Sequence, residues 1–178
     1  MRAVNLVLIG YRGTGKSTVT ELLAMRLGWK AVSTDAQIVE KVQMKIPDIV
    51  TNHGWEHFRN LETQVCLALK DQDRLVIDTG GGIILRPANM EALKPNGLVF
   101  WLTATVTTIT RRISDDTQRP ALTAGKTFLE EIQEVLTERT PKYQAAADHI
   151  IATDDLSPEE ITSQILTIAR DHGINLSC

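Results

Sequence analysis

The residues with the clearest chemical potential lie at positions 10–17, GYRGTGKS, directly after the apolar run at 5–9. Their spacing fits the phosphate-binding P-loop, in which glycines let backbone N–H groups turn inward onto a phosphate. A helix that begins after such a loop adds the positive end of its dipole. A glycine-rich turn that only links strand to helix is the competing interpretation, but the whole motif and its flanks agree with the P-loop.

Two side chains of this loop predict the use of a nucleoside triphosphate with magnesium. Lys16 offers a mobile positive charge to the β- and γ-phosphates, and Ser17 offers a hydroxyl to Mg²⁺. We therefore expect ATP as co-substrate and Mg²⁺ as cofactor. The predicted nucleotide-binding residues of this region are Gly10, Arg12, Gly13, Thr14, Gly15, Lys16, Ser17 and Thr18.

Further candidates follow other strands or lie on helices. Asp35 comes after a short strand at 29–32, and a glycine run at 80–82 comes after a strand at 75–77. Arg59 and Glu62 stand three residues apart on the polar side of a predicted helix. Arg119 lies in a segment, about 112–126, that loses hydrophobic periodicity and is typical of a lid.

Strands alternate with helices along the whole chain. We predict strands at 5–9, 29–32, 75–77, 98–102 and 150–151, and helices at 17–27, 87–93, 105–113 and 128–139, with Pro141 interrupting the last of these. The segment 46–70 is predicted as two helices broken near 53–54, and a final helix begins at Ser157. This pattern is typical of an α/β fold with a parallel sheet and ligands at the carboxyl ends of the strands.

Composition narrows the possible partners. The chain has 178 residues and a net charge of −3, so no overall positive field attracts nucleic acid or an anionic membrane. The first strand follows Met1 closely, which leaves no room for a signal peptide, and no apolar run has transmembrane length. We expect a cytoplasmic monomer that binds small molecules. Cys66 is predicted to be core, Cys178 incidental, and the four histidines to form neither a triad nor a ligand pair.

Taken together, the motifs resemble those of shikimate kinase along nearly the whole chain. The resemblance rests on the P-loop, Asp35, the run at 58–62 (FRNLE), the glycines at 80–82, and the arginines at 119 and 139. It implies a P-loop kinase fold of the nucleoside-monophosphate-kinase group: one domain over 1–178, a five-stranded parallel sheet, a lid, and a small helical substrate-binding region at about 34–62. It also implies transfer of the ATP γ-phosphate to the 3-hydroxyl of shikimate, a step of aromatic amino-acid biosynthesis.

The resemblance also implies roles for single residues. Arg59 and Arg139 match the clamp on the carboxylate of shikimate, and a guanidinium suits this task because it makes two parallel hydrogen bonds. Asp35 matches the aspartate that orients and deprotonates the attacking hydroxyl. Arg119 matches the lid arginine over the phosphates, and Arg112 matches the arginine that stacks on adenine. The backbone of Gly80, Gly81 and Gly82 would approach the shikimate ring.

One position departs from the family. Shikimate kinases normally carry an aspartate two residues before the position of Asp35, facing the magnesium, and here that residue is Ser33. The third strand instead ends in Asp78, where many relatives have a small neutral residue. We predict that Asp78 joins Ser17 at the metal. Two alternatives stay open. One is a P-loop kinase for another small molecule, such as gluconate or a nucleotide, and the other, suggested by Ser33, is a catalytically weak kinase-like protein that binds nucleotide or shikimate and regulates.

Overall fold

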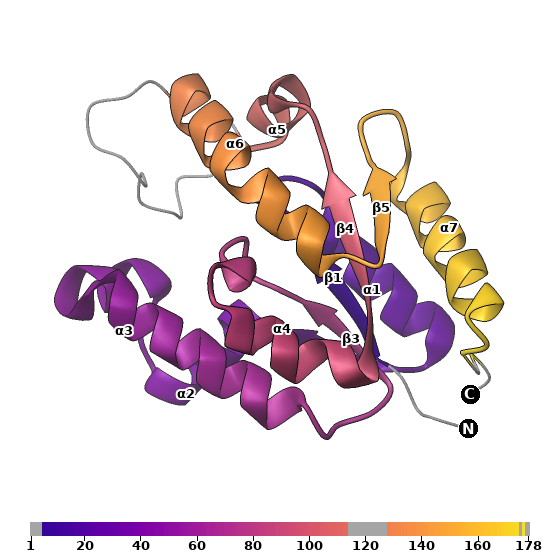
Figure 1. The fold of residues 1–178 in the computed structure, drawn as a ribbon, viewed down its shortest axis with the longest axis horizontal. Coiled ribbons are helices and arrows are strands. Elements are labelled where there is room, and N and C mark those ends of the chain that lie inside the picture. The colour runs from indigo at the N-terminus through magenta and orange to yellow at the C-terminus, as the bar shows by residue number, and fades with distance from the viewer. Residues whose placement is uncertain (1–4, 114–127, 175, 177–178) are drawn as a thin grey trace.

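A five-stranded parallel sheet forms the centre of the molecule. The computed structural model describes residues 5–113, 128–174 and 176, and the strands lie in the order β2-β3-β1-β4-β5 (Figure 1). The strands are β1 (Asn5–Ile9), β2 (Lys30–Ser33), β3 (Leu75–Asp78), β4 (Gly97–Thr103) and β5 (His149–Ala152). Each pairs in parallel with its neighbours. The predicted α/β class and the five-stranded parallel sheet are confirmed.

Helices cover both faces of the sheet, since alternate side chains of each buried strand point to opposite faces. From β1, Leu6 and Leu8 point to the face covered by α1 (Lys16–Leu27) and α7 (Pro158–Asp171). Val7 and Ile9 point to the opposite face. That face is covered by α3 (Ile46–Leu69), α4 (Pro87–Leu93) and α6 (Phe128–Ala146).

The remaining elements are short and connect these layers. They are α2 (Thr34–Val42), the 3₁₀ helix η1 (Ile83–Leu85), the 3₁₀ helix η2 (Lys94–Asn96) and α5 (Val106–Ile113). The predicted break in α3 is present at Gly54, whose backbone is not helical (φ 81, ψ 166). The last helix begins as predicted, with Ser157 as its N-cap in a capping box with Glu160.

The predicted interruption at Pro141 is wrong, because α6 continues through it to Ala146. A proline inside a helix removes one hydrogen bond and costs about 3 kcal/mol. The turn that follows is nevertheless held by Tyr143, which is fully buried and stacks on Trp101 of β4 with 5.5 Å between ring centroids. Burial of this aromatic side chain offsets the cost of the proline.

Candidate active site

Hydrogen bonds from two of its own side chains hold the loop between β1 and α1 in shape. The ammonium of Lys16 donates to the carbonyl oxygens of Gly10 (2.9 Å) and Tyr11 (3.0 Å), and the Thr14 hydroxyl donates to the carbonyl of Tyr11 (2.8 Å). Lys16 is therefore held over its own loop, with its charge where phosphates would lie.

Two glycines of this loop have backbone conformations that other residues rarely adopt. Gly10 has φ +145, and a side chain there would come within 2.4 Å of the carbonyl oxygen of Leu102. Gly15 has φ +92 and directly precedes α1, so it turns the chain into the helix without the strain that a Cβ would cause. Both glycines therefore contribute to the loop through the shape of the backbone.

A pocket opens above the loop at the carboxyl ends of the strands. The residues lining it are Arg12, Gly13, Gly15, Lys16, Ser17, Thr18, Ser33, Asp35, Asp78, Thr79 and Gly81. Six of the predicted nucleotide-binding residues thus line one cavity. Gly10 and Thr14 do not line it and act from behind, through the hydrogen bonds to Lys16 and Tyr11.

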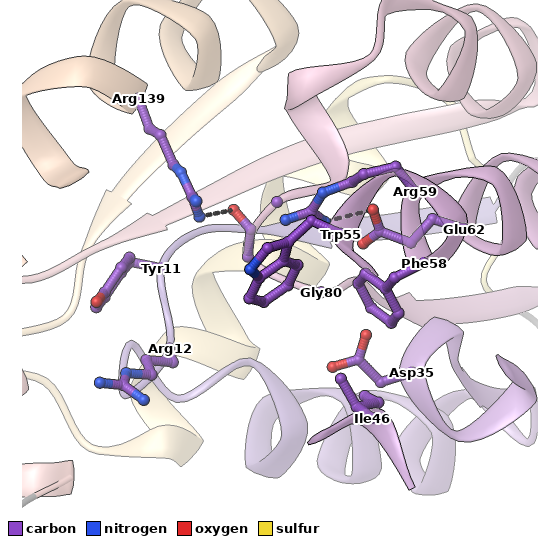
Figure 2. A pocket seen from close by; sticks show the side chains of 12 residues that line it. Tyr11, Arg12, Asp35, Ile46, Trp55, Phe58, Arg59, Glu62, Gly80 and Arg139 are labelled. Carbon is purple, nitrogen blue, oxygen red and sulfur yellow. Dashed lines mark hydrogen bonds and ion pairs between the residues drawn. The ribbon is translucent and has the colours of Figure 1, made fainter. Parts of the chain in front are cut away.

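A second pocket lies beside the first and contains both predicted clamp arginines (Figure 2). It is lined by Tyr11, Arg12, Asp35, Ile46, Trp55, Phe58, Arg59, Glu62, Gly80, Gly81, Gly82 and Arg139. Arg59 enters from α3 and Arg139 from α6, two elements far apart in the sequence. Two guanidinium groups converging on one small cavity are suited to a carboxylate.

Neighbouring side chains fix the guanidinium of Arg59. It forms an ion pair with Glu62, and it lies 5.4 Å from the ring centroid of Trp55 and 5.2 Å from that of Phe58. A Cβ on Gly82 would come within 2.3 Å of its nitrogens, so the glycine backbone must lie directly against it. The arginine is therefore oriented before any ligand binds.

Glu62 is a buried carboxyl in this pocket. Burial raises the pKa of Glu62, and the charge and hydrogen bond of Arg59 act in the opposite direction. Its side chain is 0% exposed, and its Oε1 has no hydrogen-bond partner in the described part of the chain. Oε1 and Asp35 Oδ1 would lie 3.1 and 2.6 Å from a Cβ on Gly80, so both carboxyls face this glycine.

Arg139 is almost completely buried at the other end of the pocket. Its Nη1 donates to the carbonyl of Gly81 at 3.2 Å (Figure 2). The same carbonyl also accepts from the Tyr143 hydroxyl. Burial raises the pKa of that hydroxyl above its usual value, which keeps it a neutral donor. The glycine loop after β3 is thus attached to α6.

The two pockets meet at three residues. Arg12, Asp35 and Gly81 line both of them. Asp35 lies in the first turn of α2, directly after β2, at the edge where the parallel strands end. A hydroxyl in the second pocket and a phosphate in the first would approach each other beside this carboxylate, which is the arrangement that phosphoryl transfer needs.

Comparison with known protein families agrees with an arrangement for phosphoryl transfer. The family model described as shikimate kinase matches residues 12–170. The chain belongs to the shikimate kinase family. Proteins of this family use ATP as co-substrate, and they are phosphotransferases that act on an alcohol group.

Individual shikimate kinases match over nearly their whole length. Shikimate kinase 2 of Photorhabdus laumondii is 42% identical over 92% of this chain and 94% of its own. The shikimate kinase of Geobacter sulfurreducens is 40% identical over 94% of this chain and 92% of its own. A solved shikimate kinase from Acinetobacter baumannii, in complex with shikimate, superposes with a TM-score of 0.90 at 31% identity, covering 97% of this chain and 96% of that one.

The departure at Ser33 has a structural counterpart in β3. Ser33 and Asp78 are register partners on adjacent parallel strands, so their side chains leave the sheet side by side. Asp78 accepts a hydrogen bond from the Ser17 hydroxyl at 2.6 Å. The Ser33 hydroxyl accepts from the backbone N–H of Ala36 (3.2 Å) and so caps α2, although Ser33 also lines the phosphate pocket.

Of the two remaining predicted arginines, the structure describes only one. Arg119 lies outside the described residues, as does most of the predicted lid. Arg112 is described, and its guanidinium donates to the Thr153 hydroxyl (3.0 Å), the Thr153 carbonyl (2.8 Å) and the Gly13 carbonyl (3.3 Å). It therefore connects the P-loop to the loop after β5, and stacking on adenine stays a prediction.

Sequence reasoning missed part of the acceptor pocket. Tyr11, Ile46, Trp55 and Phe58 line it, and none of them was among the predicted site residues. Trp55 is 38% exposed, which is unusual for a large aromatic side chain beside a buried one, and an aromatic pair flanking an arginine was the available signal. Arg12 was assigned to the nucleotide alone, whereas it lines both pockets.

Neither Cys66 nor any of the four histidines lines either pocket. Cys66 is buried as predicted, and burial raises its thiol pKa to about 12. His149 and His172 lie with their Nε2 atoms 2.7 Å apart, so one ring donates to the other between β5 and the end of α7. Among the described residues, no group of three or more potential ligands could hold a metal ion, and none of the helices is long and apolar enough to cross a membrane.

Proposed function

We propose that this member of the family transfers the γ-phosphate of ATP to the 3-hydroxyl of shikimate, giving shikimate 3-phosphate. The observation that carries the proposal is the pair of adjoining pockets, one around the P-loop and one around Arg59 and Arg139, which share Asp35. A carboxylate held by the two guanidiniums would direct the ring hydroxyls toward Asp35.

The donor and acceptor are activated by different residues. Lys16 binds the β- and γ-phosphate oxygens, where its charge favours the negative charge spread over the transferring group. Asp35 accepts a hydrogen bond from the attacking hydroxyl and takes its proton as the new P–O bond forms, while the bond from the γ-phosphorus to the bridging oxygen breaks and ADP leaves. The backbone of Gly80, Gly81 and Gly82 lies against the ring, and Arg112 binds the adenine side. No covalent intermediate with the protein is required.

The lid arginine completes the charge balance in this proposal. Arg119 would close over the phosphates and stabilise the transition state as an arginine finger does. We expect Arg119→Ala to lower kcat by about a thousandfold. A change confined to the KM for shikimate would contradict this role.

We propose Mg²⁺ as the cofactor, and the residues present fit it. Ser17 Oγ and Asp78 Oδ2 are oxygen donors that meet at 2.6 Å beside Lys16 in the phosphate pocket. Hard cations such as Mg²⁺ prefer oxygen, and they usually retain several waters. When bound, the ion would neutralise charge on the phosphates, with Ser17 closest and Asp78 behind it.

A substrate panel tests the function. Purified protein with ATP and Mg²⁺ is assayed for ADP release with shikimate, gluconate and nucleoside monophosphates, and Lys16→Ala serves as the control for contaminating kinases. We expect turnover with shikimate alone, lowered at least about a hundredfold by Lys16→Ala with little change in the melting curve. Turnover with gluconate alone would assign another kinase activity, and binding of shikimate without turnover would assign a regulatory protein.

We also propose that the protein works as a cytoplasmic monomer with no nucleic acid or membrane partner. The net charge of −3 supports the absence of nucleic-acid and membrane partners, because anionic polymers and surfaces would be repelled on average. Light scattering after size exclusion should give one chain's mass, and a dimer mass would contradict the proposal.

A further inference from the structure

Asn89 is a fully buried polar residue on α4 that does not line either pocket of the site. It is 0% exposed, yet each polar atom of its amide has a partner. Its Nδ2 donates to the carbonyl oxygen of Ile83 (2.9 Å), and its Oδ1 accepts from the hydroxyl of Thr63 (2.8 Å). The three residues belong to three elements, α4, η1 and α3.

The orientation of this amide is determined by its partners. The Ile83 carbonyl can only accept, so the amide nitrogen must face it, and the amide oxygen must then face Thr63. The Thr63 hydroxyl has one proton and a second possible acceptor, the Arg59 carbonyl at 3.1 Å. The shorter contact and the need of a buried amide oxygen for a donor both direct that proton to Asn89.

Both ends of this bridge lie next to the acceptor pocket. Ile83 directly follows Gly80–Gly82, and the Ile83 N–H donates back to the Gly80 carbonyl (3.1 Å). Thr63 lies one helical turn after Arg59 and next to Glu62 in α3. Since a Cβ on Gly82 would be 2.3 Å from the Arg59 guanidinium, the glycine loop and the arginine are already in contact, and a small displacement would separate or overlap them.

We infer that Asn89 is a positioning residue that sets the spacing between the glycine loop and Arg59, and thereby the affinity for the acceptor's carboxylate and ring. The inference rests on the proposed function and adds to it a residue that touches no substrate. In a preorganised site, displacement of a binding group by a fraction of an ångström lowers the affinity for the ligand. The affinity for ATP should not change, because ATP is bound by a different loop.

The test compares two buried asparagines. Asn5 is 2% exposed and also makes two hydrogen bonds, to the Gln72 carbonyl (2.7 Å) and from the Leu75 N–H (2.9 Å), but it lies at the start of β1, at the end of the sheet away from the site. Asn89→Leu and Asn5→Leu should both lower the melting temperature. Calorimetric titration should show the Kd for shikimate raised about tenfold or more in Asn89→Leu alone, with the Kd for ATP unchanged in both.

A second pair of variants keeps the test decisive if Asn89→Leu does not fold. Thr63→Val removes the donor to Asn89 and should weaken shikimate binding in the same direction, and Thr63→Ser should restore it. Unchanged shikimate affinity in Asn89→Leu or Thr63→Val would overturn the inference, as would an equal loss in Asn5→Leu. Absence of shikimate binding by the unaltered protein would instead overturn the proposed function, and with it the ligand assigned here.

Discussion

Arg59 shows how a charged side chain is prepared for binding before the ligand arrives. An arginine has many rotamers, and ordering it on binding costs free energy. Here Trp55 and Phe58 stack on the guanidinium, Glu62 forms an ion pair with it, and Gly82 leaves room for it. Most of the ordering cost is therefore incurred on folding, and more of the interaction with a carboxylate appears as affinity.

Removal of either clamp arginine should weaken acceptor binding specifically. We expect Arg59→Ala and Arg139→Ala each to reduce shikimate binding by roughly 2–5 kcal/mol, because each removes one of the two guanidinium partners of the carboxylate in a desolvated site. ATP affinity should not change. Arg59→Lys should recover little, since an ammonium cannot form the bidentate pair, and Arg26→Ala, on the exposed surface, is the control. Shikimate affinity that survives both substitutions would mean that the acceptor lies elsewhere.

The pH dependence of stability should contain a contribution from Glu62. Its folded-state pKa is raised, chiefly by burial and against the effect of Arg59. A carboxyl with a raised pKa contributes stability that is fully present below its unfolded pKa, usually near 4.5, and lost as the pH rises through the folded pKa. Glu62→Gln should therefore gain stability relative to the unaltered protein as the pH increases from about 4 to about 8.

Urea unfolding of both proteins across this range measures the difference. Glu160→Gln is a suitable control, because Glu160 is exposed and its pKa is lowered by hydrogen bonds from Ser157, so its effect has the opposite sign. If Glu62→Gln loses stability relative to the unaltered protein as the pH increases, the attraction of Arg59 outweighs burial.

At the scale of elements, much of the site could be predicted because the chemistry follows the ends of strands. The P-loop after β1, Asp35 after β2 and the glycines after β3 all reach one edge of a parallel sheet, so their proximity could be predicted from their positions along the chain. The continuation of α6 past Pro141 could not be predicted, since it depends on the packing of Tyr143 against Trp101. Asn89 was equally hidden, because its bridge depends on Thr63, which lies 26 residues away on another helix.

The pairing of β2 with β3 supports the prediction that the carboxylate beside the proposed metal stands on β3, at Asp78, in place of position 33 on β2. Asp78→Asn keeps an acceptor for Ser17 but removes the charge, and we expect it to raise the Mg²⁺ requirement about ten- to a hundredfold. Ser33→Asp with Asp78→Ser should restore part of it, because the two positions are register partners. Ser33→Asp alone should destabilise the fold, since two carboxylates would stand side by side.

Binding of Mn²⁺ in the presence of ADP, followed by electron paramagnetic resonance, gives a readout independent of turnover. The affinity for Mn²⁺ should fall in Asp78→Asn and recover partly in the double variant. Unchanged Mn²⁺ affinity, with a loss of about 1 kcal/mol of stability, would mean that Asp78 only orders the turn into Gly80.

At the scale of the whole molecule, the sheet supplies one edge where two pockets adjoin, and helices from both halves of the chain close the second pocket. Arg59 on α3 and Arg139 on α6 are brought together there because both helices cover the same face of the sheet (Figure 1). The match of family model, relatives and fold agrees with this reading across nearly the whole chain. The ring hydroxyl that receives the phosphate can be tested directly.

The direct measurement is a phosphorus–proton correlation spectrum of the products formed from ATP and shikimate. The account predicts one new phosphate ester whose phosphorus couples to the ring proton at carbon 3, formed by the unaltered protein and lost with Asp35→Asn, which keeps the shape of the side chain but cannot take the proton. An ester at another ring position, or ADP released without any ester, would contradict it.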